Sequence, residues 1–203
     1  MMTSKPKVIC LVGPTASGKS SVVKHLLSNY PAQFSKPDKY TTRPRRESER
    51  HVSDYRHVDG HVMTSLRHTG KLICEAEHCG NWYGTDPDSI SRAMNAGQIP
   101  IVIVEPSGAG SLNREVEKLG GQTVVVMLDV PLPDFVDRMI DRWCGGENAE
   151  TVMTRVSHFM QVERLWVKSI ESDILIENNS NTQISGIGKF LSTLARSGFE
   201  KVA

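Results

Sequence analysis

A chain of 203 residues is long enough for one compact domain with small inserted subdomains, and it is too short for several large ones. Its composition, 38% hydrophobic and 23% charged, is typical of a globular protein and argues against a disordered chain. The formal net charge is only +1, which argues against a general affinity for polyanions, so we expect no stable binding of nucleic acid.

The N-terminal sequence MMTSKPKVICLVG passes from a short apolar run into glycine and is not typical of a signal peptide. No apolar run approaches the ~20 residues of a membrane span, so we expect no membrane association. The four cysteines form no CxxC pair, which favours reduced thiols. We therefore expect a cytoplasmic protein.

The first predicted elements are a strand and a helix. Lys7–Val12 (KVICLV) is a short apolar run that ends at Gly13, which is typical of a buried strand. Ser20–Asn29 predicts a helix because apolar side chains recur there at helical spacing. From about residue 34 to residue 85 charged and turn residues increase, with only short β-like pieces such as Lys71–Ala76. This change of texture predicts a small inserted subdomain.

Helices and strands alternate through the rest of the chain. Asp86 and Pro87 are suited to begin, and Gly97 to end, a helix over Ser89–Ala96. The other predicted strands are Ile99–Val104, Gln122–Asp129 and Asp173–Glu177, and the other predicted helices are Ser111–Leu119, Pro133–Arg142, about Glu150–Ile170, and Gln183–Arg196. This alternation predicts an α/β fold with a parallel sheet covered by helices on both faces.

A phosphate-binding loop follows the first predicted strand. The sequence GPTASGKS, Gly13 to Ser20, matches G-x4-G-K-[ST] between a strand and a helix, as the P-loop mechanism requires. Backbone N–H groups of such a loop surround phosphate oxygens, and the helix N-terminus adds a favourable dipole. Lys19 is suited to the β- and γ-phosphates, and the Ser20 hydroxyl to Mg²⁺. The loop predicts binding of a nucleoside triphosphate but leaves the acceptor open.

Five motifs follow one another between about Lys7 and Arg196. The motifs are the loop Gly13–Ser20; Thr41, Thr42, Arg43 and Arg46 with Asp54 and Tyr55 further on; GNWYGT at Gly80–Thr85; Arg138 and Arg142 with a further Arg155; and DILIENN at Asp173–Asn179. In this order the motifs resemble those of the guanylate kinase family, and the order makes the resemblance far more specific than any single motif.

The resemblance implies a P-loop NTPase fold in a single guanylate kinase-like domain over residues 1–203. The core would comprise residues 1–33 and 86–203, with an acceptor-binding insertion at about 34–85 and a helical lid at about 138–155. The implied activity is phosphoryl transfer from ATP, with Mg²⁺, to a nucleoside monophosphate, by a monomer or a homodimer.

The resemblance also implies roles for individual residues. ATP-binding residues are Gly13, Ala16, Ser17, Gly18, Lys19, Ser20, Ser21 and Asn178, and catalytic residues are Lys19, Arg138, Arg142 and Arg155. Acceptor-binding residues are Lys39, Arg43, Arg46, Tyr55, Cys74, Tyr83, Thr85 and Glu105, and magnesium ligands are Ser20 and Glu105. Forked guanidinium groups and phenolic hydroxyls suit a nucleotide phosphate. A solvated helix face paired with Asp137 and Asp141 is an alternative for Arg138 and Arg142, and an exposed loop position is one for Glu105.

Two departures from the family pattern fall where its members recognise guanine. Lys39 stands four residues before Arg43, where the family has a serine, and Cys74 stands nine residues before Tyr83, where the family has a glutamate. Glu75 is one residue along, and a one-residue offset in a strand turns a side chain to the other face unless a bulge intervenes. A lysine only donates hydrogen bonds and cannot replace a carboxylate, although it could donate to the O6 oxygen of guanine.

Three readings of the function follow. The first is phosphorylation of GMP or dGMP. The second is a guanylate kinase-like enzyme with another acceptor, such as a modified or different nucleotide or a sugar phosphate like ribose 1,5-bisphosphate, because a buried recognition site discriminates strongly against a ligand that leaves it unpaired. The third, a non-catalytic scaffold domain, is disfavoured by the complete P-loop.

Overall fold

The computed structural model describes residues 5–45, 55–78 and 80–199. The chain groups into two units. Unit 1 comprises Met1–Val8 and Ala32–Thr123, and unit 2 comprises Ile9–Pro31 and Val124–Ala203. No helix among the described residues is both long and apolar enough to cross a membrane.

A five-stranded sheet contains the strands that position the phosphate loop. Its strands are β1 (Lys7–Val12), β2 (Phe34–Ser35), β7 (Ile99–Ile103), β8 (Gln122–Asp129) and β9 (Ile174–Glu177), in the order β2-β7-β1-β8-β9. β2 pairs with β7, and β8 with β9, in parallel. From Val8 to Val12, every β1 side chain is 1% exposed or less, as expected of a strand covered on both faces. The predicted α/β fold with a parallel sheet flanked by helices is confirmed.

Unit 1 also contains a four-stranded sheet with the order β4-β3-β6-β5. Its strands are β3 (Lys39–Thr41), β4 (Arg56–His57), β5 (Ile73–His78) and β6 (Asn81–Thr85). β6 pairs antiparallel with both β3 and β5, whereas β3 and β4 are parallel. All four strands come from the segment that the sequence predicted to be an insertion.

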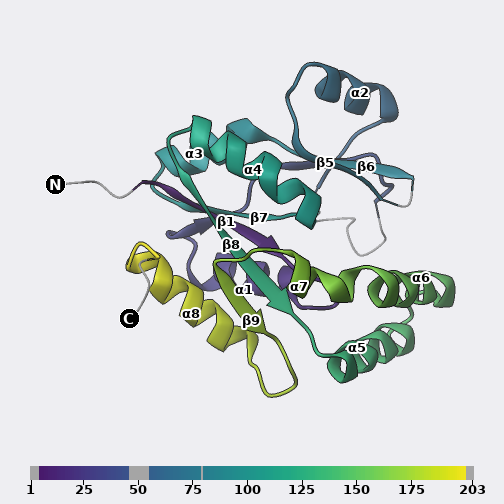
Figure 1. The fold of residues 1–203 in the computed structure, drawn as a ribbon. Helices are drawn as coiled ribbons and strands as arrows, with labels where there is room; N and C mark the ends of the chain where they lie inside the picture. The colour runs from purple at the N-terminus through teal and green to yellow at the C-terminus, as the bar shows by residue number, and fades with distance from the viewer. Residues whose placement is uncertain (1–4, 46–54, 79, 200–203) are drawn as a thin grey trace. The chain divides into compact units, whose positions relative to one another are not determined.

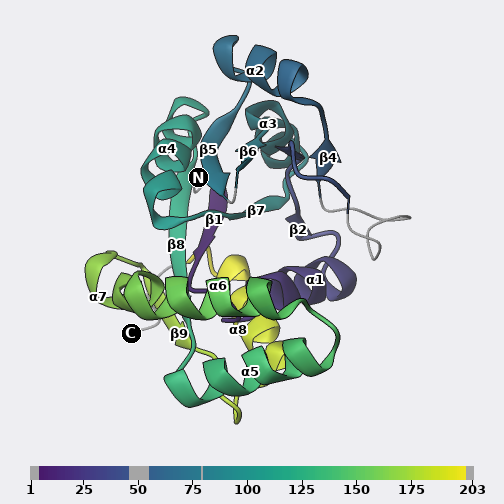
Figure 2. The same ribbon diagram turned by 90° about the vertical axis from the view of Figure 1, so that its right-hand side faces the viewer.

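The helices of unit 1 are α2 (Gly60–His68), α3 (Pro87–Asn95) and α4 (Pro106–Lys118). α3 begins as predicted, with the Asp86 carboxylate accepting a hydrogen bond from the Asp88 amide at 2.9 Å. α4 begins five residues before the predicted Ser111, because Pro106 occupies its first turn and two glycines are tolerated inside it. α4 packs against β5 (Figure 2).

The prediction of only short β-like pieces between residues 34 and 85 is wrong at α2. This nine-residue helix is capped by Asp59, whose side chain accepts from the Val62 amide at 2.8 Å. Only Met63 of α2 is buried, so the helix lacks the repeated apolar spacing by which a helix is recognised from sequence.

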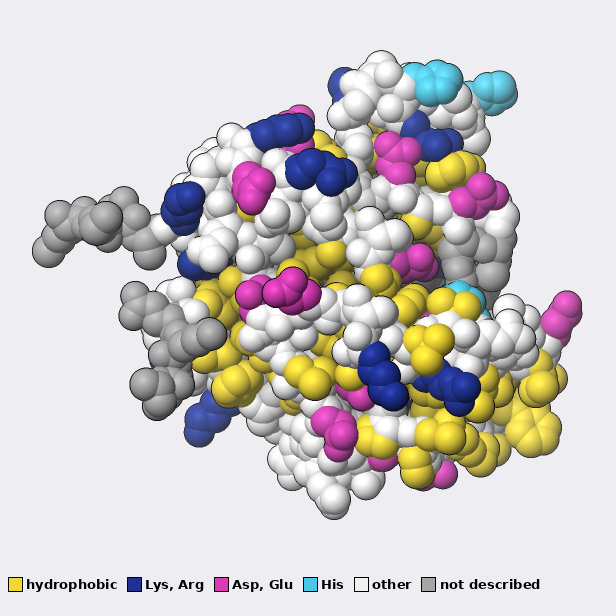
Figure 3. All heavy atoms as spheres, in the orientation of Figure 1, with side chains coloured by type: hydrophobic (Ala, Val, Ile, Leu, Met, Phe, Trp, Pro, Cys, Tyr) yellow, Lys and Arg dark blue, Asp and Glu magenta, His cyan; other side chains and the backbone are white. Residues whose placement is uncertain are grey.

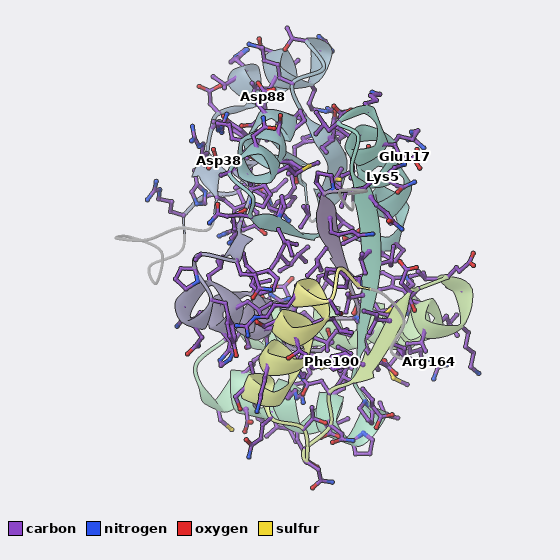
Figure 4. The ribbon with its side chains drawn as sticks, turned by 90° about the vertical axis from the view of Figure 1, so that its left-hand side faces the viewer. Lys5, Asp38, Asp88, Glu117, Arg164 and Phe190 are labelled. Carbon is purple, nitrogen blue, oxygen red and sulfur yellow. The ribbon has the colours of Figure 1, made fainter. Side chains whose placement is uncertain are left out.

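Asp38, labelled in Figure 4, pairs with Arg56 at 2.8 Å and with Arg92 of α3 at 3.4 Å.

Unit 2 contains α1 (Lys19–Asn29), α5 (Leu132–Cys144), α6 (Ala149–Gln161), a 3₁₀ turn η2 (Glu163–Leu165), α7 (Trp166–Ser169) and α8 (Ile184–Arg196). The single helix predicted over about Glu150–Ile170 is wrong, because the chain leaves helical geometry at Val162, where φ is −127°. Apolar residues continue at helical spacing through this break, so the sequence pattern alone does not predict it.

α5 and α6 run side by side and share a small core (Figure 1). The rings of Phe135 and Phe159 stack with their centroids 3.7 Å apart, and Val130, Met139 and Val152 complete the cluster. The outer side of the pair also carries apolar side chains, including Val136, Ile140, Trp143 and Met153. Figure 3 shows hydrophobic side chains gathered over this region. On α8, Phe190 is also exposed (Figure 4).

Candidate functional site

The phosphate loop has a backbone shape that requires glycine at two positions. Gly13 has φ +150°, and a Cβ there would lie 2.1 Å from the Leu128 carbonyl oxygen of β8. Gly18 has φ +94°, and a Cβ there would lie 2.5 Å from the Asn178 side-chain nitrogen. Both positions are positive in φ and tightly enclosed, so any larger residue would displace the loop.

Side chains from three elements hold successive residues of the loop. The Thr15 amide donates to the Glu163 carboxylate at 2.7 Å. Arg138 of α5 donates to the Ala16 carbonyl at 2.8 Å. Asn178, just after β9, donates to the Ser17 carbonyl at 2.8 Å. Ala16 has φ +61°, which is unusual for a residue other than glycine. The loop is therefore held in a conformation that its backbone alone would not favour.

Lys19 folds over the loop that precedes it. Its ammonium group donates to the carbonyl oxygens of Gly13 and Pro14, both at 2.7 Å. This arrangement places one positive charge directly against the loop, where the backbone carbonyls keep the flexible side chain in place.

A cavity of about 520 Å³ opens beside the loop in unit 2. Its lining residues are Thr15, Ala16, Gly18, Lys19, Ser20, Ser21, Arg138, Asp141, Arg142, Arg155, Asn178 and Ile184. Four of these side chains are cationic and one is anionic, so the cavity suits a polyphosphate. The structure thus brings together all four predicted catalytic residues with most of the predicted ATP-binding residues. Gly13 and Ser17 shape the loop without lining the cavity.

Two of the cavity arginines share one carboxylate. Glu147, between α5 and α6, pairs with Arg155 at 3.0 Å and with Arg142 at 3.4 Å. Partial burial alone would raise the pKa of Glu147, but attraction and hydrogen bonds from Arg155 and Arg142 outweigh it and hold that pKa below its usual value. The two guanidinium groups are therefore already directed to one anionic group.

In unit 1, Arg43, Tyr55, His57 and Tyr83 form a cluster. The Arg43 guanidinium lies 5.8 Å from the centroid of the Tyr55 ring, and Tyr55 meets Tyr83 edge to face at 5.7 Å. The His57 ring nitrogen Nδ1 lies 2.6 Å from the Arg43 carbonyl oxygen. The predicted clamp residues Arg43, Tyr55 and Tyr83 thus lie together, while Arg46 falls outside the described residues.

The strand register places Lys39 beside Thr85 on one face of the four-stranded sheet. Lys39 pairs with Thr85 and Thr41 with Tyr83, so these four side chains share that face. The Lys39 ammonium donates to the Ile103 carbonyl oxygen at the end of β7. Thr85 is buried on this face, with 2% exposure.

A β-bulge at Cys74 and Glu75 decides which way their side chains point. Ile73 pairs with Thr85 but Ala76 pairs with Tyr83, so β5 carries one extra residue. Because Ala76 shares the Tyr83 face, Glu75 lies on the opposite one. Glu75 is bonded there to Arg67 at 2.6 Å, and the Arg67 guanidinium lies 3.3 Å from the centroid of the Trp82 ring. The bulge therefore takes Glu75 away from the Lys39 and Tyr83 face.

Cys74 occupies the strained position of the bulge. Its φ is +52°, and its thiol donates to the Gly108 carbonyl of α4 at 3.5 Å. Burial raises the pKa of this thiol to about 11, although the nearby Lys39 charge opposes that change. The side chain is therefore a neutral thiol at physiological pH.

The two predicted magnesium ligands are both exposed oxygen donors. Ser20 lies in the first turn of α1 and lines the cavity, and Glu105 immediately precedes α4 in unit 1. Among the residues that the structure describes, no three His, Cys, Asp or Glu side chains form a cluster that could hold a metal ion. Taken singly, each donor type fits Mg²⁺, which takes few protein ligands and relies on phosphate oxygens and water.

Sequence reasoning missed Thr15, Asp141, Ile184 and Glu163. The first three line the cavity, and Glu163 is 5% exposed and bonded to the loop. Thr15 lies within the loop motif and could have been included on that signal. Glu163 is 148 residues away in sequence from its partner Thr15, so only the tertiary structure reveals its place.

Comparisons with known proteins agree on one family. The family model described as guanylate kinase matches residues 5–193. The guanylate kinase of Streptomyces coelicolor is 30% identical over 155 residues, which is 76% of this chain and 75% of that protein. Protein PALS1 of Danio rerio is 34% identical over 101 residues, which is 50% of this chain but only 15% of that protein.

A solved structure shows the same fold over nearly the whole chain. The crystal structure of guanylate kinase from Anaplasma phagocytophilum superposes with a TM-score of 0.66 and 20% identity, covering 98% of this chain and 89% of that one. This likeness shows the fold, and the family match over most of the sequence confirms the resemblance drawn from the five motifs. The chain belongs to the guanylate kinase family of nucleoside monophosphate kinases.

Proposed function

We propose that the chain transfers the γ-phosphoryl group of ATP to the phosphate of a nucleoside monophosphate, with GMP or dGMP as the leading acceptor. The observation that carries this proposal is the cavity at the phosphate loop, which combines Lys19 with Arg138, Arg142 and Arg155. Guanine is the leading base because the relatives that align over most of their length are named guanylate kinases.

The proposed reaction needs positioning and charge neutralisation more than covalent help. An oxygen of the acceptor phosphate forms a bond to the γ-phosphorus while the bond to the β–γ bridging oxygen breaks, which releases ADP. Lys19 and the three arginines bind the oxygens on which negative charge is spread. Mg²⁺, when bound, neutralises charge on the β- and γ-phosphates, and Ser20 and Glu105 are its proposed protein ligands.

Arg142 and Arg155 are proposed to exchange the Glu147 carboxylate for a phosphate group when ATP binds. Both are paired with Glu147, and both line the cavity. A phosphate group carries more negative charge than a carboxylate and accepts forked hydrogen bonds, so it competes well for the two guanidinium groups. Glu147 thus keeps the arginines extended toward the cavity before ATP binds.

Arg43, Tyr55 and Tyr83 are the proposed grip on the acceptor phosphate. The edge-to-face contact of the two tyrosine rings and the position of Arg43 over Tyr55 fix these groups relative to one another. A guanidinium and two phenolic hydroxyls match the charge and acceptor oxygens of a phosphate monoester.

A second candidate is an acceptor that does not contain guanine. The sheet face that bears Lys39 favours this candidate. Guanine offers N–H donors at its Watson–Crick edge and needs a hydrogen-bond acceptor there. Lys39 only donates, the Cys74 thiol is neutral, and Glu75 is bonded to Arg67 on the other face. An acceptor that exposes carbonyl or phosphate oxygens to Lys39 would be recognised better, as in another nucleotide or a sugar phosphate.

The proposal is tested by ADP release from ATP·Mg with a panel of NMPs, dNMPs and sugar phosphates, including ribose 1,5-bisphosphate. Turnover with GMP or dGMP above all others supports the first candidate, and turnover with an oxygen-rich acceptor supports the second. If no small acceptor gives turnover that Lys19→Ala abolishes, the kinase proposal is wrong.

Restoring the family's residues tests the assignment of the base-reading face. We expect Lys39→Ser with Cys74→Glu to raise kcat/KM for GMP by roughly 10-fold or more, because a paired recognition site discriminates strongly. Glu75→Gln is the matched control, since Glu75 faces Arg67, and it should leave the GMP value unchanged. If the double variant leaves the GMP value unchanged, the face assignment is wrong.

A further inference from the structure

We propose that Glu163 is a positioning residue of the phosphate loop: its buried carboxylate holds Thr15 and thereby sets the shape in which the loop receives ATP. One carboxylate oxygen accepts from the Thr15 amide at 2.7 Å, and the other lies 3.2 Å from the Thr15 hydroxyl. His158 Nδ1 is 3.0 Å from that second oxygen. The inference rests on the proposed binding of ATP at this loop.

The loop needs such a contact because it contains a strained residue. Ala16 has φ +61°, a conformation that costs a residue with a Cβ on the order of 1–2 kcal/mol. Strained residues persist only where their surroundings over-determine them. Glu163 fixes the amide of the residue before Ala16, while Arg138 and Asn178 fix the carbonyls of Ala16 and Ser17. Of these three side chains, only Glu163 is acidic, and only Glu163 accepts a hydrogen bond from a backbone N–H group of the loop.

The helix break at Val162 is what brings Glu163 to the loop. α6 ends at Gln161, and the 3₁₀ turn η2 starts at Glu163 itself. His158, in the last turn of α6, reaches forward to the same carboxylate and so ties the two sides of the break together. Glu163 is 5% exposed, and a buried acid is retained at low cost only when its oxygens are hydrogen-bonded, as they are here.

Glu163 also links the loop to a helix that carries a cavity arginine. Arg155 lies three residues before His158 on α6, so the two occupy neighbouring positions on the helix surface. Arg155 lines the same cavity as Thr15. The contact between Glu163 and Thr15 therefore anchors the C-terminal end of α6 to the loop, and with it the helix from which Arg155 lines the same cavity.

The test compares Glu163→Ala and Glu163→Gln by calorimetric titration with ATP·Mg without acceptor, and by steady-state kinetics. We expect Glu163→Ala to weaken ATP binding by roughly 10- to 100-fold, because the partly buried Thr15 amide loses its acceptor. The KM for the acceptor should stay unchanged. Glu163→Gln keeps one oxygen for the Thr15 amide, so it should recover part of the loss. Glu171→Ala, which removes an exposed acid outside the cavity, is the control and should bind ATP like the unmodified chain.

A purely structural role predicts a different result. In that case Glu163→Ala would lower the Tm but would not change the Kd for ATP measured well below that Tm. This result would overturn the proposal. Should Glu163→Ala fail to fold, Glu163→Met decides instead, because it fills a similar volume and offers the Thr15 amide no oxygen acceptor; unchanged ATP affinity in that variant also overturns the proposal. ATP binding that depends on Glu163 without turnover of any small acceptor would sink the proposed reaction and leave this inference standing.

Discussion

At the scale of single residues, Lys39 and Cys74 are the departures from the family pattern on the proposed acceptor side. Cys74 adopts a φ of +52° at a bulge position where glycine is usual, and its thiol lies against α4. Lys39 reaches the end of β7 and lies near enough to Cys74 to influence its pKa. These two residues replace an expected serine and glutamate, so we propose that they decide which acceptor is recognised.

The raised pKa of Cys74 makes stability depend on pH in a defined window. The folded chain keeps the thiol proton up to about pH 11, whereas an ordinary thiol loses it near pH 9. The stabilisation is therefore complete below pH 9 and is lost as pH rises toward 11. We expect the free energy of unfolding by urea, relative to that of Cys74→Ala, to fall by roughly 2–3 kcal/mol across this window.

Cys144 supplies the matched control, because it is exposed. Cys144→Ala should follow the pH dependence of the unmodified chain, while Cys74→Ala should lose part of it. If the free energy of unfolding of the unmodified chain and that of Cys74→Ala change in parallel between pH 9 and 11, the Cys74 thiol is not buried in solution.

At the scale of elements, the packing of α8 on α1 depends on one glycine (Figure 2). A Cβ at Gly188 would lie 2.3 Å from the His25 ring of α1. Gly186, in the same helix, has open space around its missing side chain. Alanine at Gly188 therefore tests packing, and alanine at Gly186 tests helix propensity, within the same helix.

We expect opposite effects of alanine at these two positions. Gly188→Ala should destabilise the fold by roughly 1–3 kcal/mol through overpacking. Gly186→Ala should stabilise it by roughly 0.5–1 kcal/mol through helix propensity. Urea unfolding measures both changes, and adding His25→Ala should recover part of the Gly188→Ala loss. Equal effects of the two single variants would contradict the close approach of α8 to α1.

Elements with strong periodicity were predicted well, and those determined by distant contacts were not. β1 and β8 have the predicted bounds because a continuous apolar run bounded by glycine or aspartate is a local signal. The break at Val162 is not local: Glu163 is bonded to Thr15 and His158, and these contacts stabilise a turn where the apolar spacing alone favours a longer helix. The bulge at Cys74 likewise depends on pairing with β6.

At the scale of the whole molecule, ATP binding should appear as thermal stabilisation. A ligand that binds only the folded chain at 100 times its Kd adds about 2.7 kcal/mol, which for a chain of this size raises the Tm by roughly 5–11 °C. We expect this shift with ATP·Mg in differential scanning fluorimetry. Lys19→Ala should remove most of it, because that ammonium lies against the loop. An equal shift in Lys19→Ala would place the ATP site elsewhere.

The sequence alone determined the α/β fold, the family and the position of the phosphate loop, because each is encoded by short-range patterns: apolar runs, glycine spacing and motif order. The tertiary structure alone decided that Glu75 faces Arg67, that Cys74 is a partly buried neutral thiol, and that Glu163 holds Thr15. Side-chain direction at a bulge and the burial of an acid depend on partners far away in the chain, and no local pattern records them.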